Sequence, residues 1–229
     1  MLEVTHIEHS GFCLEMEKRV LIFDWYRGKL PLLKKDKPVY VFVSHSHGDH
    51  YGPCIWKLRK QFSKVQYYLD DTIRLSDKKE DTVFISPENH YEQDGMAIDT
   101  FVSNDEGSAF LVQADGYRIY HAGDLNLWLW DDNTPDEDKY MKDVYSSQMK
   151  RLKECLHGEK LDVAMVPLDP RLEKTAPEGL AYFMEHIGAR YVFPMHYFGR
   201  KKEAEEEAKG KKLASYQEFF HFEDSFQLP

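Results

Sequence analysis

A dense group of metal-binding side chains follows one short apolar run. Residues 39–43 are all β-branched or aromatic, which is typical of a strand covered on both faces, and the next seven residues read Ser-His-Ser-His-Gly-Asp-His. Histidines two positions apart project to the same side of an extended chain, so His45 and His47 can converge on one ion. Asp49 and His50, beyond the glycine turn, can point at a second ion. Packing explains an isolated histidine among 11, but it does not explain this cluster.

The overall charge disfavours polyanionic partners. Forty acidic residues against 30 basic ones give a formal net charge of −10. A negative surface opposes nonspecific binding to nucleic acid or anionic lipid, because neutralised phosphates supply most of that affinity. We therefore expect a small-molecule substrate, with no membrane partner and with nucleic acid disfavoured. Whether the chain is a monomer or a homo-oligomer stays open.

Cysteine use and hydropathy point to the cytoplasm. Cys13, Cys54 and Cys155 are widely spaced and form no C-x-x-C pair, as is usual for reduced thiols. The first residues alternate between polar and apolar as a strand does, and no window approaches the roughly 18 uninterrupted apolar residues that cross a bilayer. We expect a cytoplasmic protein that is not exported.

Hydrophobic patterning predicts a β-rich chain that opens with an antiparallel meander. The predicted strands cover residues 2–8, 11–16, 19–24, 39–43 and 65–69. The predicted helices cover residues 54–62, 136–156, 176–187 and 200–213. The last of these is rich in Lys and Glu, which is typical of a solvated helix face.

The second half of the chain resembles the first. Residues 108–124 and 11–24 each read as a strand, a short turn and a strand that ends in Asp. We predict a single domain over residues 1–229, with repeated halves of about 1–107 and 108–229. The predicted fold class is α+β, a four-layer αβ/βα sandwich of two packed mixed sheets with outer helices.

Two later strand ends offer further ligands. The segment His-Ala-Gly-Asp ends at Asp124, where the glycine lets the carboxylate approach closely and bridge two ions. A turn-capping role explains Asp124 equally well, because Asp favours such positions. Residues 191–196 form an apolar strand that ends in His196, which is either a ligand or a core histidine.

The ordered motifs resemble the metallo-β-lactamase superfamily of metal-dependent hydrolases, and in particular its lactonase-like branch. They are L-I-F-D ending at Asp24, S-H-S-H-G-D-H ending at His50, A-G-D ending at Asp124 and F-P-M-H ending at His196. The resemblance implies the metallo-β-lactamase fold and two divalent ions, with Asp24 orienting the histidine loop. By this resemblance the first ion is held by His45 and His47, the second by Asp49, His50 and His196, and both by Asp124.

One ligand that the family usually supplies is absent. The loop over residues 102–108, which precedes the strand before the bridging Asp, contains no histidine. We take Asp105 as the first candidate substitute, with Glu106 or Asn104 next and a nonligand acidic turn as the alternative. His121 is another candidate for this position. Zn²⁺ is the first choice of metal, and an oxygen ligand here would shift the preference toward Mn²⁺ or Fe²⁺.

The chemistry that this site implies is hydrolysis without a protein nucleophile. Two ions roughly 3.5–4 Å apart lower the pKa of a shared water toward about 7. Asp124 would hold both ions, and Asp49 could accept the proton of the attacking hydroxide. His121 or Tyr197 could protonate the leaving group, although buried packing roles explain both residues.

Three side chains near these motifs have open roles. Trp128 and Trp130, which follow Asp124, either wall the substrate pocket or pack in the core. His9 resembles an early histidine of some branches of the superfamily, and no catalytic role is assigned to it.

Three functions compete. The leading hypothesis is a hydrolase of a small-molecule ester, lactone or phosphodiester. The second is a nucleic-acid phosphodiesterase similar to ribonuclease Z, which the net charge disfavours. The third is a noncatalytic metal-binding sensor, suggested by the missing histidine.

Overall fold

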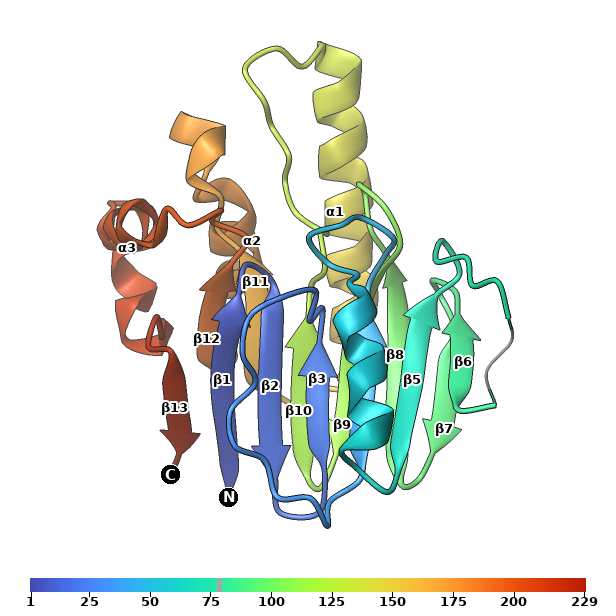
Figure 1. Cartoon of the computed structure of the whole chain (residues 1–229). Helices are drawn as coiled ribbons and strands as arrows, with labels where there is room; N and C mark the ends of the chain where they lie inside the picture. Colours follow the sequence, from blue (N-terminus) through green and yellow to red (C-terminus); the bar gives the residue numbers. More distant parts are fainter. Residues whose placement is uncertain (78–79) are drawn as a thin grey trace. The chain divides into compact units, whose positions relative to one another are not determined.

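The computed structural model describes residues 1–77 and 80–229 (Figure 1). The chain divides into two units: unit 1 comprises residues 1–86 and 223–229, and unit 2 comprises residues 87–222. Within the described residues, unit 1 contains a seven-stranded sheet and unit 2 a six-stranded sheet. The predicted repetition of the chain, with halves of about 1–107 and 108–229, stays a prediction.

Unit 1 opens with the predicted antiparallel meander and continues with parallel strands. The strands of its sheet, in chain order, are β1 (Leu2–Glu8), β2 (Gly11–Met16), β3 (Val20–Phe23), β4 (Val39–Val43), β5 (Val65–Asp70), β6 (Thr82–Ile85) and β13 (Ser225–Leu228). Pairing is antiparallel from β1 to β3 and parallel from β3 to β6. Strand β13 runs antiparallel beside β1, which brings the last residues back to the first strand (Figure 1).

Strand β4 is covered on both faces, as its composition predicted. All five of its residues are buried. On one face Phe42 stacks between Phe23 and Tyr68 of the neighbouring strands, with ring centroids 4.9 Å apart on each side. On the other face the strand's valines pack with Ile55 and Leu58. These two residues belong to η1 (Pro53–Lys60), a 3-10 helix where the sequence predicted a helix over residues 54–62.

Unit 2 repeats the order of antiparallel strands followed by parallel ones. Its strands are β7 (His90–Gln93), β8 (Met96–Val102), β9 (Ser108–Ala114), β10 (Tyr117–His121), β11 (Leu161–Pro167) and β12 (Ala189–Met195). Pairing is antiparallel from β7 to β10 and parallel from β10 to β12. The carboxyl ends of β10, β11 and β12 therefore meet at one edge of this sheet, and the predicted ligands of unit 2 follow such strand ends.

Helices of unit 2 flank this sheet. They are α1 (Pro135–Cys155), η2 (Pro170–Thr175), α2 (Glu178–His186), α3 (Lys201–Lys209) and η3 (Ala214–Phe219). Helix α1 begins with a capping box, in which Thr134 and Glu137 satisfy each other's backbone N–H groups. It contacts β8, where the Gln148 side chain accepts a hydrogen bond from the Val102 N–H at 3.1 Å.

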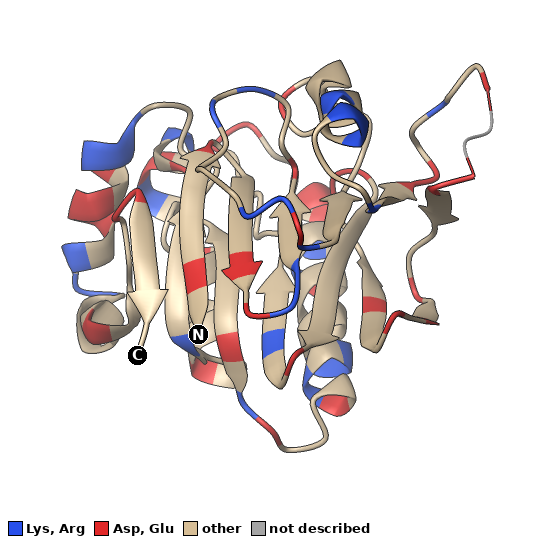
Figure 2. Ribbon diagram, turned by 60° about the horizontal axis from the view of Figure 1, so that its bottom comes forward, with Lys and Arg blue, Asp and Glu red and all other residues tan. Residues whose placement is uncertain are grey.

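Helix α3 is the solvated helix that the sequence predicted. It is shorter than the predicted range of 200–213 and buries only Ala204 and Ala208, one turn apart, while its Lys and Glu residues face outward. Its basic positions stand at the two ends of the helix and its acidic positions lie between them (Figure 2). Among the residues that the structure describes, no helix has the length and apolar character needed to cross a membrane.

Candidate metal centre

In unit 1 the predicted ligands gather in a histidine cluster, which we define as His9, His45, His47, Asp49 and His50. The last four residues follow the end of β4 directly. His45 and His50 are fully buried, whereas His47 is exposed. The Nε2 atom of His45 lies 2.9 Å from Nδ1 of His47, so these two imidazoles converge as their spacing predicted.

Asp24 orients this loop from the end of β3. It is fully buried, and its backbone adopts a left-handed conformation with φ of 44°. Its carboxylate accepts hydrogen bonds from the Ser44 N–H at 2.8 Å, from the Ser44 hydroxyl at 2.6 Å and from His50 Nδ1 at 2.8 Å. Because an ionised carboxylate only accepts, His50 carries its proton on Nδ1, and Nε2 is left as the metal-binding nitrogen.

His9 completes the histidine cluster, although the sequence assigned it no role. Its Nε2 lies 3.4 Å from the Asp49 carboxylate, and its ring meets His50 edge-on at 5.5 Å. One ligand atom from each of these three residues lies within 4.8 Å of the others. The His9 imidazole beside the carboxylate holds the pKa of Asp49 well below its usual range, although partial burial acts in the opposite direction.

The backbone at His9 has an unusual conformation. The residue lies in the turn between β1 and β2 with φ of 54°, a conformation that is uncommon outside glycine and is found at functional sites. Gly11, two residues later, begins β2 so close to β3 that an added Cβ would lie 3.1 Å from the Asp24 carbonyl oxygen. A histidine beside such a glycine indicates a tightly packed turn.

In unit 2 three predicted ligands and Asp169 form the carboxylate–imidazole cluster, which we define as Asp105, Asp124, Asp169 and His196. Asp124 follows β10 through a turn at Gly123, whose φ is 53°, and only 4% of Asp124 is exposed. His196 follows β12 with φ of 64°. Its Nε2 lies 3.3 Å from the Asp124 carboxylate, so the sheet brings these two predicted residues together.

Asp169 is the member of this cluster that the sequence analysis missed. It follows β11 and is fully buried. Its Oδ2 atom lies 3.1 Å from Nδ1 of His196. Burial alone would lower the pKa of His196, but the carboxylates of Asp124 and Asp169 raise it to about 9. The sequence held a signal for Asp169, because it stands two residues beyond an apolar strand, as His45 does after β4.

The loop that lacks the expected histidine supplies one nearby carboxylate. An oxygen of Asp105, which is exposed, lies within 4.8 Å of one from Asp124. Asn104 instead fixes the segment after Asp124, since its amide donates to the Asn126 carbonyl at 2.6 Å and accepts from the Asn126 N–H at 3.2 Å. Metal binding by Asp105 stays a prediction, as does that by Glu106.

Two side chains with open roles brace the turn around Asp124. His121 is fully buried, and its Nδ1 accepts a hydrogen bond from the Gly123 N–H at 3.1 Å. The indole of Trp128 donates to the Asp124 carbonyl at 2.7 Å, packs 5.1 Å from the His196 ring and stacks on Trp130. Trp128 therefore supports the cluster from within the core.

Comparison with known proteins shows the family of the chain. The family described as the Beta-lactamase superfamily domain matches residues 3–137, more than half of the chain. The chain belongs to the metallo-β-lactamase superfamily. A relative named a metal-dependent hydrolase, from Thermococcus kodakarensis, is 28% identical over 216 residues, which cover 86% of this chain and 85% of the relative.

Solved structures of this superfamily share the fold. A metallo hydrolase from Ignicoccus hospitalis has a TM-score of 0.69 at 17% identity and covers 100% of this chain and 99% of its own. A metallo-β-lactamase fold protein from Bacillus subtilis has a TM-score of 0.57 at 16% identity, and the match covers 91% of this chain and 92% of that protein. The predicted α+β class, the metallo-β-lactamase fold and the assignment as a metal-dependent hydrolase are confirmed.

The donor sets suit the divalent metal ions on which the superfamily depends. Three buried imidazoles are held at Nδ1 by a partner that leaves Nε2 for metal: the partner is the Ser44 hydroxyl at 2.9 Å for His45, Asp24 for His50 and Asp169 for His196. Such partners fix the orientation of ligand histidines in metalloproteins. Imidazole nitrogens and carboxylate oxygens together match divalent transition ions.

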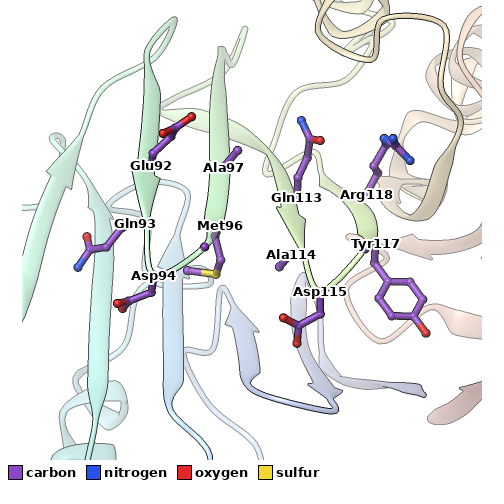
Figure 3. A pocket seen from close by; sticks show the side chains of 12 residues that line it. Glu92, Gln93, Asp94, Met96, Ala97, Gln113, Ala114, Asp115, Tyr117 and Arg118 are labelled. Atoms are coloured by element: carbon purple, nitrogen blue, oxygen red, sulfur yellow. The ribbon is translucent and has the colours of Figure 1, made fainter.

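A groove of unit 2 lies away from Asp124 and His196. It has a volume of about 660 Å³ and is formed by the turns between β7 and β8 and between β9 and β10, with Asp94 and Asp115 at those turns (Figure 3). These turns lie at the beginning of β10, whereas Asp124 follows its end. The groove contains none of the predicted ligands.

Proposed function

We propose that this metal-dependent hydrolase cleaves an ester, lactone or phosphodiester bond of a small molecule and uses two divalent ions, with Zn²⁺ as the first choice. The observation that carries the proposal is the set of oriented imidazoles, each held at Nδ1 by a hydroxyl or carboxylate. The assignment of ligands to ions follows the family resemblance. The proposed ligands are His45, His47, Asp49, His50, Asp105, Asp124 and His196.

The bound ions would supply a water activated to hydroxide near neutral pH. The protein's own groups prepare the site for that chemistry. His9 stabilises the charged form of Asp49 and so extends the ionised range of this carboxylate to lower pH. Asp49 would accept the proton as the hydroxide attacks. Asp169 holds His196 so that Nε2 faces Asp124.

The test compares two Asp→Asn variants in unit 2. Asp124→Asn should lower metal content and reduce kcat/KM by ~100-fold or more, because it removes a charged ligand that the proposal assigns to both ions. Asp115→Asn is the matched control, since it lies in the turn at the beginning of β10, where Asn tolerates the left-handed φ of 49°. Metal content is measured by mass spectrometry, and turnover with 4-nitrophenyl acetate, a simple lactone and bis(4-nitrophenyl) phosphate.

The outcomes separate the competing functions. Unchanged turnover by Asp124→Asn would refute the ligand assignment. A fully metal-loaded protein that cleaves none of the three substrates would refute the hydrolase proposal in favour of a sensor. Tight binding of structured RNA at physiological salt would instead support the ribonuclease Z-like alternative.

A further inference from the structure

An arginine is fixed beside the carboxylate–imidazole cluster. Arg171, in η2, binds the Asp169 carboxylate through Nε at 2.9 and 3.0 Å and through Nη2 at 2.6 Å. The same Oδ2 atom of Asp169 contacts His196 Nδ1 at 3.1 Å. The guanidinium is therefore one carboxylate away from a proposed metal ligand, and its orientation is set before any ligand arrives.

Two aromatic rings confine this guanidinium. Its central carbon lies 3.8 Å from the ring centroid of Phe198 and 5.6 Å from that of Trp130. Phe198 is 44% exposed, so a large apolar ring lies at the surface directly against a charged group. Stacking on aromatic faces restricts an arginine without consuming its N–H donors.

Part of the donor edge of Arg171 stays available. A guanidinium carries five N–H donors, and Asp169 engages only Nε and Nη2. Nη1 makes no hydrogen bond with any residue that the structure describes, and 38% of the side chain is exposed. The arginine is thus rigid, reachable from solvent and able to donate.

Strained backbone surrounds the same group. His196 and Phe198 have φ of 64° and 44°, and Glu173, two residues after Arg171, has φ of 52° and ψ of −115°. Conformations of this kind cost of order 1–3 kcal/mol each and cluster at active sites and ligand clamps.

We infer that Arg171 and Phe198 bind an oxyanion of the substrate next to the bond that is cleaved. The planar fork of a guanidinium matches the oxygens of a carboxylate or of a phosphoryl group, and Phe198 offers an apolar surface for the rest of the molecule. The enzyme therefore prefers anionic esters, lactones or phosphodiesters over neutral ones. This preference rests on the proposed hydrolase function, whereas anion binding by Arg171 does not.

The first experiment compares Arg171→Lys with Arg190→Lys in the metal-loaded enzyme. Lysine keeps a positive charge beside buried Asp169, so the fold is preserved while the fork is lost. Arg190, at the beginning of β12, pairs with Asp162 at 3.3 Å and is the matched control. Three substrates are compared: bis(4-nitrophenyl) phosphate, the 4-nitrophenyl monoester of succinate and neutral 4-nitrophenyl acetate.

The Arg171→Lys variant should raise KM by about tenfold or more for at least one of the two anionic substrates, while kcat for that substrate changes little. Both KM and kcat for the neutral ester should change little. Which of the two anions responds identifies the phosphoryl or the carboxylate group as the recognised oxyanion. Phe198→Leu should raise KM for the same substrate by a smaller factor. An equal loss of kcat on all three substrates would overturn the inference, because Arg171 would then act only through Asp169 and His196.

A second measurement does not depend on turnover. Calorimetric titration of the metal-loaded protein with inorganic phosphate and with acetate should show weaker binding of at least one anion by Arg171→Lys than by the wild type or Arg190→Lys. Equal dissociation constants in all three proteins would overturn the inference. If no substrate is cleaved but this difference holds, the hydrolase proposal fails while the anion site stands.

Discussion

The histidine cluster of unit 1 and the carboxylate–imidazole cluster of unit 2 are assembled by different routes. Unit 1 takes His45, His47, Asp49 and His50 from one loop after β4, and only His9 comes from elsewhere. Unit 2 takes its members from loops that follow β8, β10, β11 and β12. The first cluster is therefore largely a local property of the chain, and the second exists only once the strand order of its sheet has formed.

The two clusters also differ in how their orienting carboxylates are satisfied. Asp24 is fully buried and accepts from donors in the loop after β4, namely the Ser44 N–H, the Ser44 hydroxyl and His50. Asp169 is equally buried, but one of its partners, Arg171, is 38% exposed. Water can replace a lost partner at Arg171 and cannot do so as easily around Asp24.

The largest expected effect tests this difference in stability. Asp24→Ala should destabilise the metal-free protein by roughly 3–5 kcal/mol, because it leaves buried donors without an acceptor. Asp169→Ala should lower the free energy of unfolding by only about 1–3 kcal/mol, since Arg171 can be hydrated and His196 can release its proton. Urea unfolding followed by circular dichroism measures both. Equal losses would show that the two orienting carboxylates are equivalent after all.

A second prediction concerns the preference between Zn²⁺ and Mn²⁺. We expect the carboxylates of the carboxylate–imidazole cluster to set it. Asp105→His restores the imidazole that the family usually supplies and should raise the affinity for Zn²⁺ relative to Mn²⁺ by about tenfold. Competition titrations with a chromogenic chelator measure the ratio. Glu106→His is the matched control on the same loop. If Glu106→His shifts the ratio and Asp105→His does not, Glu106 is the ligand.

The smallest expected effect is a shift in pH dependence caused by His9. The contact between His9 and Asp49 lowers the pKa of Asp49, so His9→Asn should raise that pKa toward its ordinary value. Protons then compete with metal from a higher pH, and the acid limb of the metal-binding profile moves upward. Asn tolerates the left-handed backbone at this position.

The control for this measurement is His90→Asn, at an exposed histidine that pairs with Asp99. It should leave the acid limb of the metal-binding profile in place. An unmoved limb in His9→Asn would show that the histidine cluster holds Asp49 ionised without His9.

Much of the fold could be predicted because it follows from short-range patterning. The opening meander, the buried strand β4 and helix α1 occur close to their predicted ranges. The helix predicted at 200–213 ends early, at Lys209, and the one at 54–62 has 3-10 geometry. Such differences arise at element ends, where packing competes with local propensity.

His9, Asp169 and Arg171 could not be assigned from the sequence for a different reason. Each acts through a partner that only folding brings near: Asp49 for His9, and His196 for Asp169. Arg171 is held in place by a hydrogen bond to Asp169 and by stacking on Phe198. No periodicity or motif spacing encodes such pairs.

The sequence by itself determined the family, the alternation of strands and helices, and the loop that carries most of the histidine cluster, because neighbouring residues and backbone geometry suffice for each. The tertiary structure decided which carboxylates orient the imidazoles, which tautomer His50 adopts, and where a rigid arginine is exposed. These properties depend on burial and on contacts between distant residues, which exist only after the strands have paired.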